Sequence, residues 1–348
     1  MKLATRCIPL GTLPYNDIDL TGRMAAKLFE KIPFLPILPL VDSCDSVERR
    51  TLEDIPLIKV DGKKLTLLQL TNKEKKELEK LDKAFNTPNV KILESYAIKS
   101  PYIEKFINLI KKFKSPNAIV NLLGPFSISQ MLNKMAEEQM LIDRSYRKLF
   151  VQSVCVKALW IIDKMKEVNP DIVPIIMLEE PLLGQIGVLK RENEDITSEL
   201  IISLFNKTIE KLKESGAVVG IQCLEKCDWK VPIQAGADII SFDAYNNPNN
   251  LCIIPEAVND FIDNGGLINW GIVPITSESL VKSLNIDFIN KRLLATMDGL
   301  ILAGVPREKV YNSALVSING NTEHLSLIFA EKAVMLSNQL SKRIPVIK

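Results

Sequence analysis

The stretch Ile172–Glu180 reads IVPIIMLEE, a nearly unbroken apolar run that ends in two carboxylates. Apolar runs without alternation are typical of parallel strands that are covered on both faces. Residues 144–168, which precede it, repeat apolar side chains at helical intervals. A second helix-length segment, Thr197–Ser215, follows and is closed by Gly216, a residue suited to the left-handed position after a helix. The centre of the chain therefore predicts helix, strand, helix.

The same pattern continues on both sides of this stretch. Further apolar runs of strand length are Ala118–Leu123, Ala217–Cys223, Ala237–Asp243, Gly266–Val273 and Val310–Ser317. Each is separated from the next by material long enough for a helix, and strands that alternate with helices favour a parallel sheet with right-handed crossovers. We predict an α/β protein with one domain over residues 1–348, a single (β/α)8 TIM barrel with an irregular N-terminal extension.

The N-terminal hundred residues are less regular. Thr5–Leu10 is a candidate first strand, whereas the proline-rich Ile32–Leu40 is expected to be a loop or an edge, because proline cannot donate within a central strand. Leu65–Leu70 predicts a strand or turn before a solvated helix at Thr71–Phe85. Capping-box spacing occurs at Thr71 and Glu74 and again at Ser127 and Gln130.

Composition excludes several classes of function. The chain has 348 residues, 47% hydrophobic and 25% charged, with a formal charge of +2. This balance gives no reason to expect nucleic acid as a partner. No apolar run reaches the ~18 residues of a membrane span, so no membrane partner is expected either. The six scattered cysteines are typical of reduced thiols, which predicts a cytoplasmic protein. A single histidine, His324, excludes a two-histidine metal site and is more typical of a helix surface.

In TIM barrels the chemistry lies where the strands end. Glu179 and Glu180 are neighbours there, and because neighbouring strand residues point to opposite faces, we expect only one, Glu179, to enter the pocket. It could act as an acid or base if burial raises its pKa. The alternative is a carboxylate that interacts with a helix N-terminus. Cys223 and Cys227 form a C-x3-C pair that is either an altered thiolate site or two buried thiols.

Taken in chain order, several motifs resemble those of the cobalamin-independent methionine synthase family, specifically its C-terminal catalytic barrel, within the uroporphyrinogen decarboxylase/methionine synthase-like superfamily. They are GTLPY (11–15), IPFLPILPL (32–40), GPFSIS (124–129), EEPLL (179–183), CDW (227–229), ADIISFDAY (237–245) and WGIVP (270–274). The resemblance covers nearly the whole chain and implies a methionine synthase-like (β/α)8 barrel.

The resemblance also implies a zinc ion that binds and deprotonates an acceptor thiol. Family members bind it through a His-x-Cys pair, an acidic residue and a final cysteine. Here the histidine position falls on Gln222 or Ile221, and the paired cysteine on Leu224 or Cys223. Asp243 matches the acidic ligand, but residues 312–315 supply no final cysteine. Zinc sites use three or four protein ligands. Zinc is therefore disfavoured, and no metal is expected unless Cys223 and Asp243 belong to a rebuilt site. No other cofactor is indicated.

Two functions follow from the resemblance. The first is a methyltransferase that acts on a small thiol or amino acid, with a degenerate zinc site and a corrinoid protein as the possible methyl donor. The second is a non-catalytic ligand-binding or accessory barrel. A decarboxylase is a weaker third. The candidate catalytic residues are Glu179, Cys223 and Asp243. The candidate substrate-binding residues are Gly11, Thr12, Ser127, Glu180, Gln222, Asp228, Trp229 and Tyr245. The two aromatic residues could equally be structural plugs.

Overall fold

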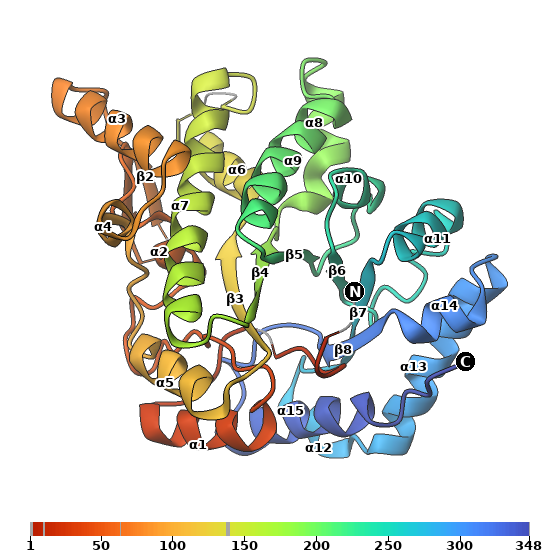
Figure 1. The fold of residues 1–348 in the computed structure, drawn as a ribbon. Helices are drawn as coiled ribbons and strands as arrows, with labels where there is room; N and C mark the ends of the chain where they lie inside the picture. The colour runs from red at the N-terminus through yellow and green to blue at the C-terminus, as the bar shows by residue number, and fades with distance from the viewer. Residues whose placement is uncertain (1–2, 10, 63, 137–139, 348) are drawn as a thin grey trace.

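The computed structural model describes residues 3–9, 11–62, 64–136 and 140–347. Its main sheet has six strands, all parallel and paired in chain order (Figure 1). They are β3 (Asn117–Leu123), β4 (Val173–Glu179), β5 (Val218–Cys223), β6 (Ile239–Phe242), β7 (Leu267–Val273) and β8 (Ala314–Ile318). Parallel neighbours require crossover connections, and helices provide them, as the alternating pattern predicts.

Two irregular N-terminal segments occupy the remaining two positions in the barrel wall. The first segment contains Cys7 and Thr12, and the second segment contains Phe34 and Ile37. The bridges that join them to each other and to the sheet are Cys7 with Val316, Thr12 with Ile37, and Phe34 with Ile119, all parallel. Two backbone hydrogen bonds support each joint. The prediction of a (β/α)8 barrel with an irregular N-terminal part is confirmed. Cys7 lies in the predicted first strand, whose last residue, Leu10, is outside the described residues.

The proline-rich segment, expected as a loop or an edge, lies between the first segment and β3 as the second position of the wall. Only its non-proline residues donate to the neighbouring segments. Leu35 donates to the carbonyl of Ile119, and Ile37 donates to that of Gly11. A proline at every third position cannot donate, so the pairing is reduced to isolated bridges. The prediction of a loop is confirmed in that the segment forms no strand, whereas the edge position is not, because the segment has a neighbour on each side.

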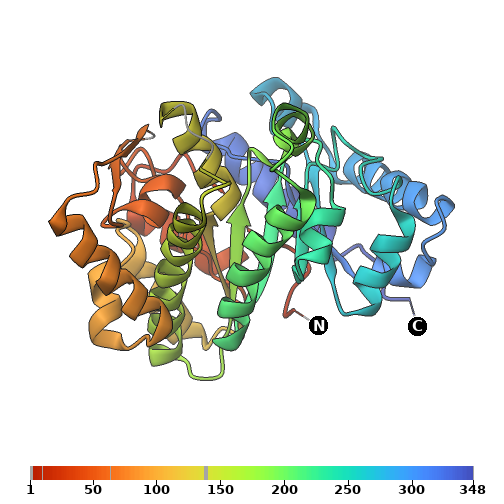
Figure 2. The same ribbon diagram turned by 90° about the horizontal axis from the view of Figure 1, so that it is seen from above.

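Helices cover the outside of the barrel. The longest, α7 (Arg144–Val168), has the bounds that the sequence predicts and packs beside α9 (Ser198–Glu214). Figure 2 shows the orange N-terminal helices and the blue C-terminal helices on opposite flanks of the sheet. The others are α1 (Ile18–Leu28), α2 (Val47–Leu52), α3 (Asn72–Asn86), α4 (Val90–Leu93), η1 (Glu94–Tyr96), α5 (Ile103–Phe113), α6 (Pro125–Ala136), η2 (Leu183–Gln185), α8 (Ile186–Glu192), α10 (Lys230–Gln234), α11 (Pro255–Asp263), α12 (Glu278–Ser283), α13 (Ile286–Leu302), α14 (Arg307–Asn312) and α15 (Leu327–Ser341). A hairpin of β1 (Ile58–Asp61) and β2 (Lys64–Leu67) stands apart from the barrel wall.

The two predicted capping boxes have different outcomes. Thr71 caps α3, accepting a 3.3 Å hydrogen bond from the amide of Glu74. Ser127, in contrast, is the third residue of α6 rather than its cap. Its hydroxyl accepts a hydrogen bond from the amide of Leu182, and its own amide donates to Glu180. The prediction that Ser127 caps the helix is therefore wrong. The helix begins two residues earlier, at Pro125, and proline is well suited to the first helical position.

The interior of the barrel is packed tightly below its mouth. Met177, Gly220 and Ile239 lie opposite one another on successive strands. A Cβ on Gly220 would overlap the sulfur of Met177 and crowd Ile239. Glycine at this position therefore makes room for a large neighbour on the same face of the sheet.

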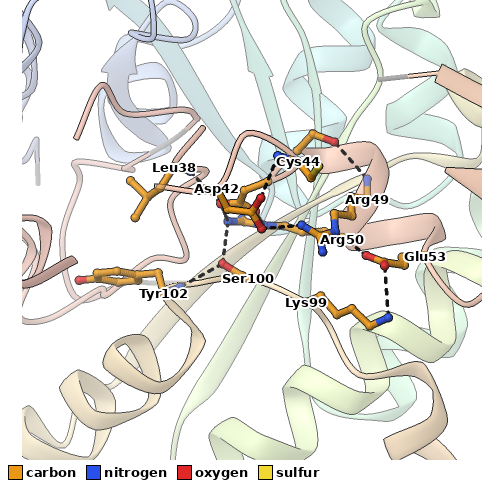
Figure 3. A network of polar contacts seen from close by, with 11 residues as sticks. Leu38, Asp42, Cys44, Arg49, Arg50, Glu53, Lys99, Ser100 and Tyr102 are labelled. Atoms are coloured by element: carbon orange, nitrogen blue, oxygen red, sulfur yellow. Dashed lines mark hydrogen bonds and ion pairs between the residues drawn. The ribbon is translucent and has the colours of Figure 1, made fainter. Parts of the chain in front are cut away.

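A buried arginine ties the irregular second segment to α2. Arg50 and Asp45, both fully buried, form an ion pair at 3.3 Å. Arg50 also donates to the carbonyl of Leu35 at 2.6 Å and to that of Pro36. Figure 3 shows Arg50 beside Ser100, with the more exposed Arg49, Glu53 and Lys99 next to it. The isolated bridges of the second segment leave the carbonyls of Leu35 and Pro36 without a partner in a strand ladder, and Arg50 supplies the hydrogen bonds that they need.

None of the helices in the described part of the chain has the length and apolar character needed to cross a membrane.

Candidate functional site

Each of the six apolar strands carries a polar side chain within it or at its end. These residues are Asn121, Glu179, Gln222, Ser241, Asn269 and Ser317. Glu179, Gln222, Ser241 and Asn269 lie directly opposite one another in register. Residues in register share a face of a sheet, and here that face is the barrel interior. We call this set the polar layer. It lies toward the carboxyl ends of the strands, where TIM barrels hold their ligands.

Hydrogen bonds join the polar layer across strands. Asn121 donates from its side chain to Glu179 Oε1 at 2.7 Å. Asn269 donates to the hydroxyls of Ser241 at 2.8 Å and Ser317 at 2.9 Å. The layer is therefore two separate groups, one around Glu179 and one around Asn269, with Gln222 in register between them.

Two acceptors in the polar layer have no hydrogen-bond partner among the described residues. They are the side-chain carbonyl oxygens of Gln222 and Asn269. The two residues are 8% and 0% exposed. A buried acceptor without a partner costs about 1–3 kcal/mol. A ligand that donates hydrogen bonds in the barrel would recover this cost.

Glu179 is the acidic member of the polar layer and is half-buried at its outer edge. Burial raises the pKa of its carboxyl group, and the negative charge of Glu48 adds to this effect. The hydrogen bond from Asn121 and the positive charge of Arg50 oppose the rise. Its second oxygen has no hydrogen-bond partner within the described part of the chain. A carboxyl group in this setting can bind a cation or exchange a proton.

Glu180 points to the other side of β4. Its carboxylate accepts hydrogen bonds from the amides of Phe126, at 3.1 Å, and Ser127, at 2.7 Å, at the start of α6. Burial raises the pKa of this group to about 8, against the opposite effect of the two amides. The helix N-terminus interaction that was an alternative for the carboxylate pair is thus made by Glu180. The structure does not bring Glu180 or Ser127 into the mouth.

Cys223 also lies on the outer face, since its partner in register is Phe242, while Gln222 faces inward opposite Ser241. The structure therefore does not bring Cys223 together with Glu179 and Asp243. Burial, followed by the adjacent Cys223 thiol, raises the pKa of Cys227. A protonated buried thiol is a poor nucleophile. The two cysteines are accordingly best described as buried thiols.

The predicted aromatic site residues differ in their surroundings. Trp229 is buried and packs edge-on against Phe242, whose ring contacts Trp270 at 5.3 Å between centroids. It is a plug on the outer face. Tyr245 is half-buried beneath the guanidinium of Arg292, 5.3 Å from its ring centre. Tyr245 is thus the more accessible of the two.

The remaining predicted residues make local contacts. Asp243 accepts hydrogen bonds on both oxygens from Asn246, at 2.9 Å and 2.6 Å. Asp228 is exposed and accepts from the amide of Lys230 at 3.1 Å. Asp243 follows Ser241 by two residues and so continues the inner face of β6. Both of its carboxylate oxygens accept hydrogen bonds within the turn that follows β6.

The predicted GTLPY turn is fastened to the loop after β8. The amide of Thr12 donates to Asn321 Oδ1 at 3.0 Å, and its carbonyl accepts from the hydroxyl of Thr322 at 2.8 Å. Gly11 has a φ of 86°, and a side chain there would overlap Asn321. The backbone of both predicted residues is therefore used to hold the mouth together.

The register decides between the two alignments of the zinc positions. The inner face of β5 carries Gln222, and the next residue of that face is Leu224. Residues 312–315 run from the end of α14 into the first two residues of β8, at the end of the barrel opposite the mouth. No group of three or more His, Cys, Asp and Glu side chains in the described ranges could hold a metal ion. The side chains at these positions do not fit the zinc site that the resemblance implies.

Sequence reasoning missed Asn121, Ser241, Asn269 and Ser317. A usable signal was present, because each is the polar residue within an otherwise apolar run, as in AIVNLL and ALVSI. Such a residue in a strand covered on both faces must find a polar partner or ligand.

Comparisons with known proteins identify no family for this chain. No family model matches the chain, and no curated protein matches it. Similar solved structures include a Bacteroidetes-affiliated GH5 cellulase linked with a polysaccharide utilization locus, at 13% identity and a TM-score of 0.44 over 72% of this chain and 77% of that chain. Another is a chitobiase of Flavobacterium johnsoniae, at 12% identity and a TM-score of 0.39 over 99% of this chain and 53% of that chain. Likeness this remote carries no information about activity.

Proposed function

We propose that the barrel mouth binds a small molecule with a protonated amino group, and that Glu179 is its counter-ion. The observation that carries this proposal is the position of Glu179, held inside the barrel by Asn121 with one oxygen unpartnered in the described structure. The unpartnered oxygens of Gln222 and Asn269 are further acceptors for a ligand that donates hydrogen bonds. A small amino acid is the substrate class that the resemblance implies.

The proposed activity is ligand binding without zinc-assisted chemistry. The inner positions of β5 carry an amide and a leucine, and Asp243 is already bonded to Asn246. These side chains do not form a three-ligand site. A thiol activated by a resident metal is therefore not part of the proposal.

Ligand titration by calorimetry tests the proposal. The panel is methionine, homocysteine and cysteine, each with its N-acetyl analogue, which lacks the positive charge. We expect saturable binding of at least one free amino acid and none of its analogue. Glu179→Gln preserves the acceptor for Asn121 but removes the charge, and should weaken binding by about tenfold or more, the effect of a lost charged hydrogen bond.

Glu225→Gln is the matched control, because Glu225 is an exposed carboxylate on the loop after β5. It should bind as the wild type does. Equal binding of the N-acetyl analogue, or unchanged affinity in Glu179→Gln, would contradict the proposal.

Methyl transfer is a second candidate, favoured by the colinear motifs at the strand ends and by the raised pKa of Glu179, which suits an acid or base. Incubation of the purified chain with a methylated corrinoid and homocysteine tests it. Methionine formation that depends on Glu179 would support this activity, and its absence with bound homocysteine would favour binding alone.

A further inference from the structure

A cavity of about 730 Å³ lies at the end of the barrel opposite the polar layer. It is lined where the strands begin, by Leu267 of β7 and Ala314 of β8. The last turns of α1 and α15 form another wall, where Asn338 donates to the carbonyl of Leu28 at 2.9 Å. Its volume is within the range of small-molecule sites.

The charges that line this basal cavity are unbalanced. Arg6, Lys27, Lys31 and Lys342 carry four positive charges, and Glu30 is the one acid among the lining residues that the structure describes. None of the three lysines forms an ion pair within the described residues. The whole chain has a charge of only +2, so this concentration of positive charge is local.

Arg6 is the most constrained of these cations. Its guanidinium donates to the carbonyls of Tyr311, at 3.0 Å, and Pro345, at 3.4 Å, which are neutral groups. Burial lowers its pKa, and no neighbouring acid offsets that effect. A partly buried charge without a counter-ion is costly, and an anion in the cavity would remove the cost.

Helix dipoles account for part of the arrangement. Lys27 lies in the last turn of α1, and Lys342 caps α15, so both face the negative end of a helix. Arg6 also meets the negative end of a helix, because Tyr311, which accepts its hydrogen bond, lies in the last turn of α14. Lys31 has no such explanation, and the dipoles supply none of the four cations with a full negative charge.

The other lining residues include several apolar side chains. Those that keep exposed surface are Leu3, Leu28 and Val346, and Val346 is 71% exposed. An inorganic ion would leave most of this volume empty, whereas a ligand with an apolar part would bury these side chains. We propose that the basal cavity binds an organic anion, a phosphate or carboxylate group attached to an apolar body, with Arg6 and Lys31 at the anionic group.

Calorimetry with octyl phosphate, octanoate, inorganic phosphate and uncharged octanol tests the proposal. We expect one saturable site for at least one of the two amphiphilic anions, with weaker binding of inorganic phosphate and octanol. The preferred amphiphile identifies the head group as phosphate or carboxylate. The double variant K31E/K342E changes two exposed residues and should weaken binding at least tenfold.

K75E/K111E is the control, because it changes the net charge equally at exposed positions outside the cavity. Thermal melts show whether both variants are folded. Failure of both amphiphiles to saturate, or equal weakening in the two variants, would overturn the proposal. Because this cavity and the polar layer lie at opposite ends of the barrel, the result is independent of the function proposed for Glu179.

Discussion

Glu179 and Glu180 are adjacent in the chain, yet their carboxylates bind on opposite sides of β4. Glu179 accepts from Asn121 inside the barrel, and Glu180 accepts from the amides of Phe126 and Ser127 at the start of α6. The alternation of strand side chains thus separates one carboxylate that can meet a ligand from one that joins two elements of the fold.

The first prediction concerns Glu180 and pH. Its folded-state pKa of about 8 lies above the ordinary 4.5, so between these values the folded chain holds a proton that the unfolded chain has lost. Stability should therefore fall as pH rises through this window. Glu180→Gln should make the decline shallower, leaving the contribution of the same sign from Glu179. Urea unfolding from pH 5 to 8 measures it.

At pH 5 the same variant should lose about 1–3 kcal/mol, because the new NH2 group faces an amide donor. The exposed Glu225→Gln should keep the wild-type pH profile. An unchanged slope in Glu180→Gln would show that Glu180 does not titrate in this range.

The second prediction concerns the buried ion pair. Asp45→Asn leaves Arg50 without a counter-charge in a fully buried position and should cost about 3–5 kcal/mol of unfolding free energy. The double variant D45N/R50M should lose less than the sum of the single variants. A double-mutant cycle in urea measures this coupling. The partly exposed pair Arg49 and Asp42 is the control, expected to show a smaller coupling than the buried pair. Similar coupling in the two pairs would refute the argument from burial.

The third prediction concerns the packed interior. Gly220→Ala forces Met177 to move within a filled barrel and should destabilise the fold by about 1–3 kcal/mol. Gly187, in α8, has open space around it, so Gly187→Ala should instead stabilise by about 0.5–1 kcal/mol through helix propensity. Chemical denaturation of both variants compares them. A Gly220→Ala protein as stable as the wild type would show that the interior can adjust freely.

The fourth prediction concerns metal. Freshly purified protein should contain well below one zinc per chain, since the inner face of β5 offers Gln222 and Leu224 rather than two ligands. Cys223→Ser should not change the metal content. Elemental analysis of both proteins decides the question. Stoichiometric zinc that disappears in Cys223→Ser would restore the rebuilt metal site.

The barrel could be predicted because strong local patterns determine most of it. Helix α7 was predicted with its observed bounds, since its apolar positions recur over seven turns and Asp143 caps it. The proline-rich second segment was predicted to be irregular, but its place in the wall was not predicted, because it is held in part by hydrogen bonds from Arg50, a residue of another element. Long-range partners of this kind leave no periodic signal in the sequence.

The candidate site was predicted less well, since its residues depend on strand phase. If the assignment of inner and outer positions along β5 is shifted by one residue, Cys223 faces the interior and Gln222 faces the helices. Glu179 was recognised because strand alternation limits the choice to two neighbours. Asn269 and Ser317 were missed because a polar side chain in an apolar strand signals that it needs a partner but does not identify the partner, and only the assembled barrel shows that the two are hydrogen-bonded.

The strand pairing around the barrel wall is weakest at the three joints made by the two N-terminal segments, and we call this part of the wall the seam. β3 and β4 pair over seven residues, whereas the three joints of the N-terminal segments have two backbone hydrogen bonds each. Amides at these joints should exchange with solvent through smaller local openings than those of the six-stranded arc. Because Leu35 donates to the carbonyl of Ile119, on the strand that also supplies Asn121, such an opening would loosen the support of Glu179. The stability of the seam is therefore coupled to the position of the carboxylate in the proposed binding site.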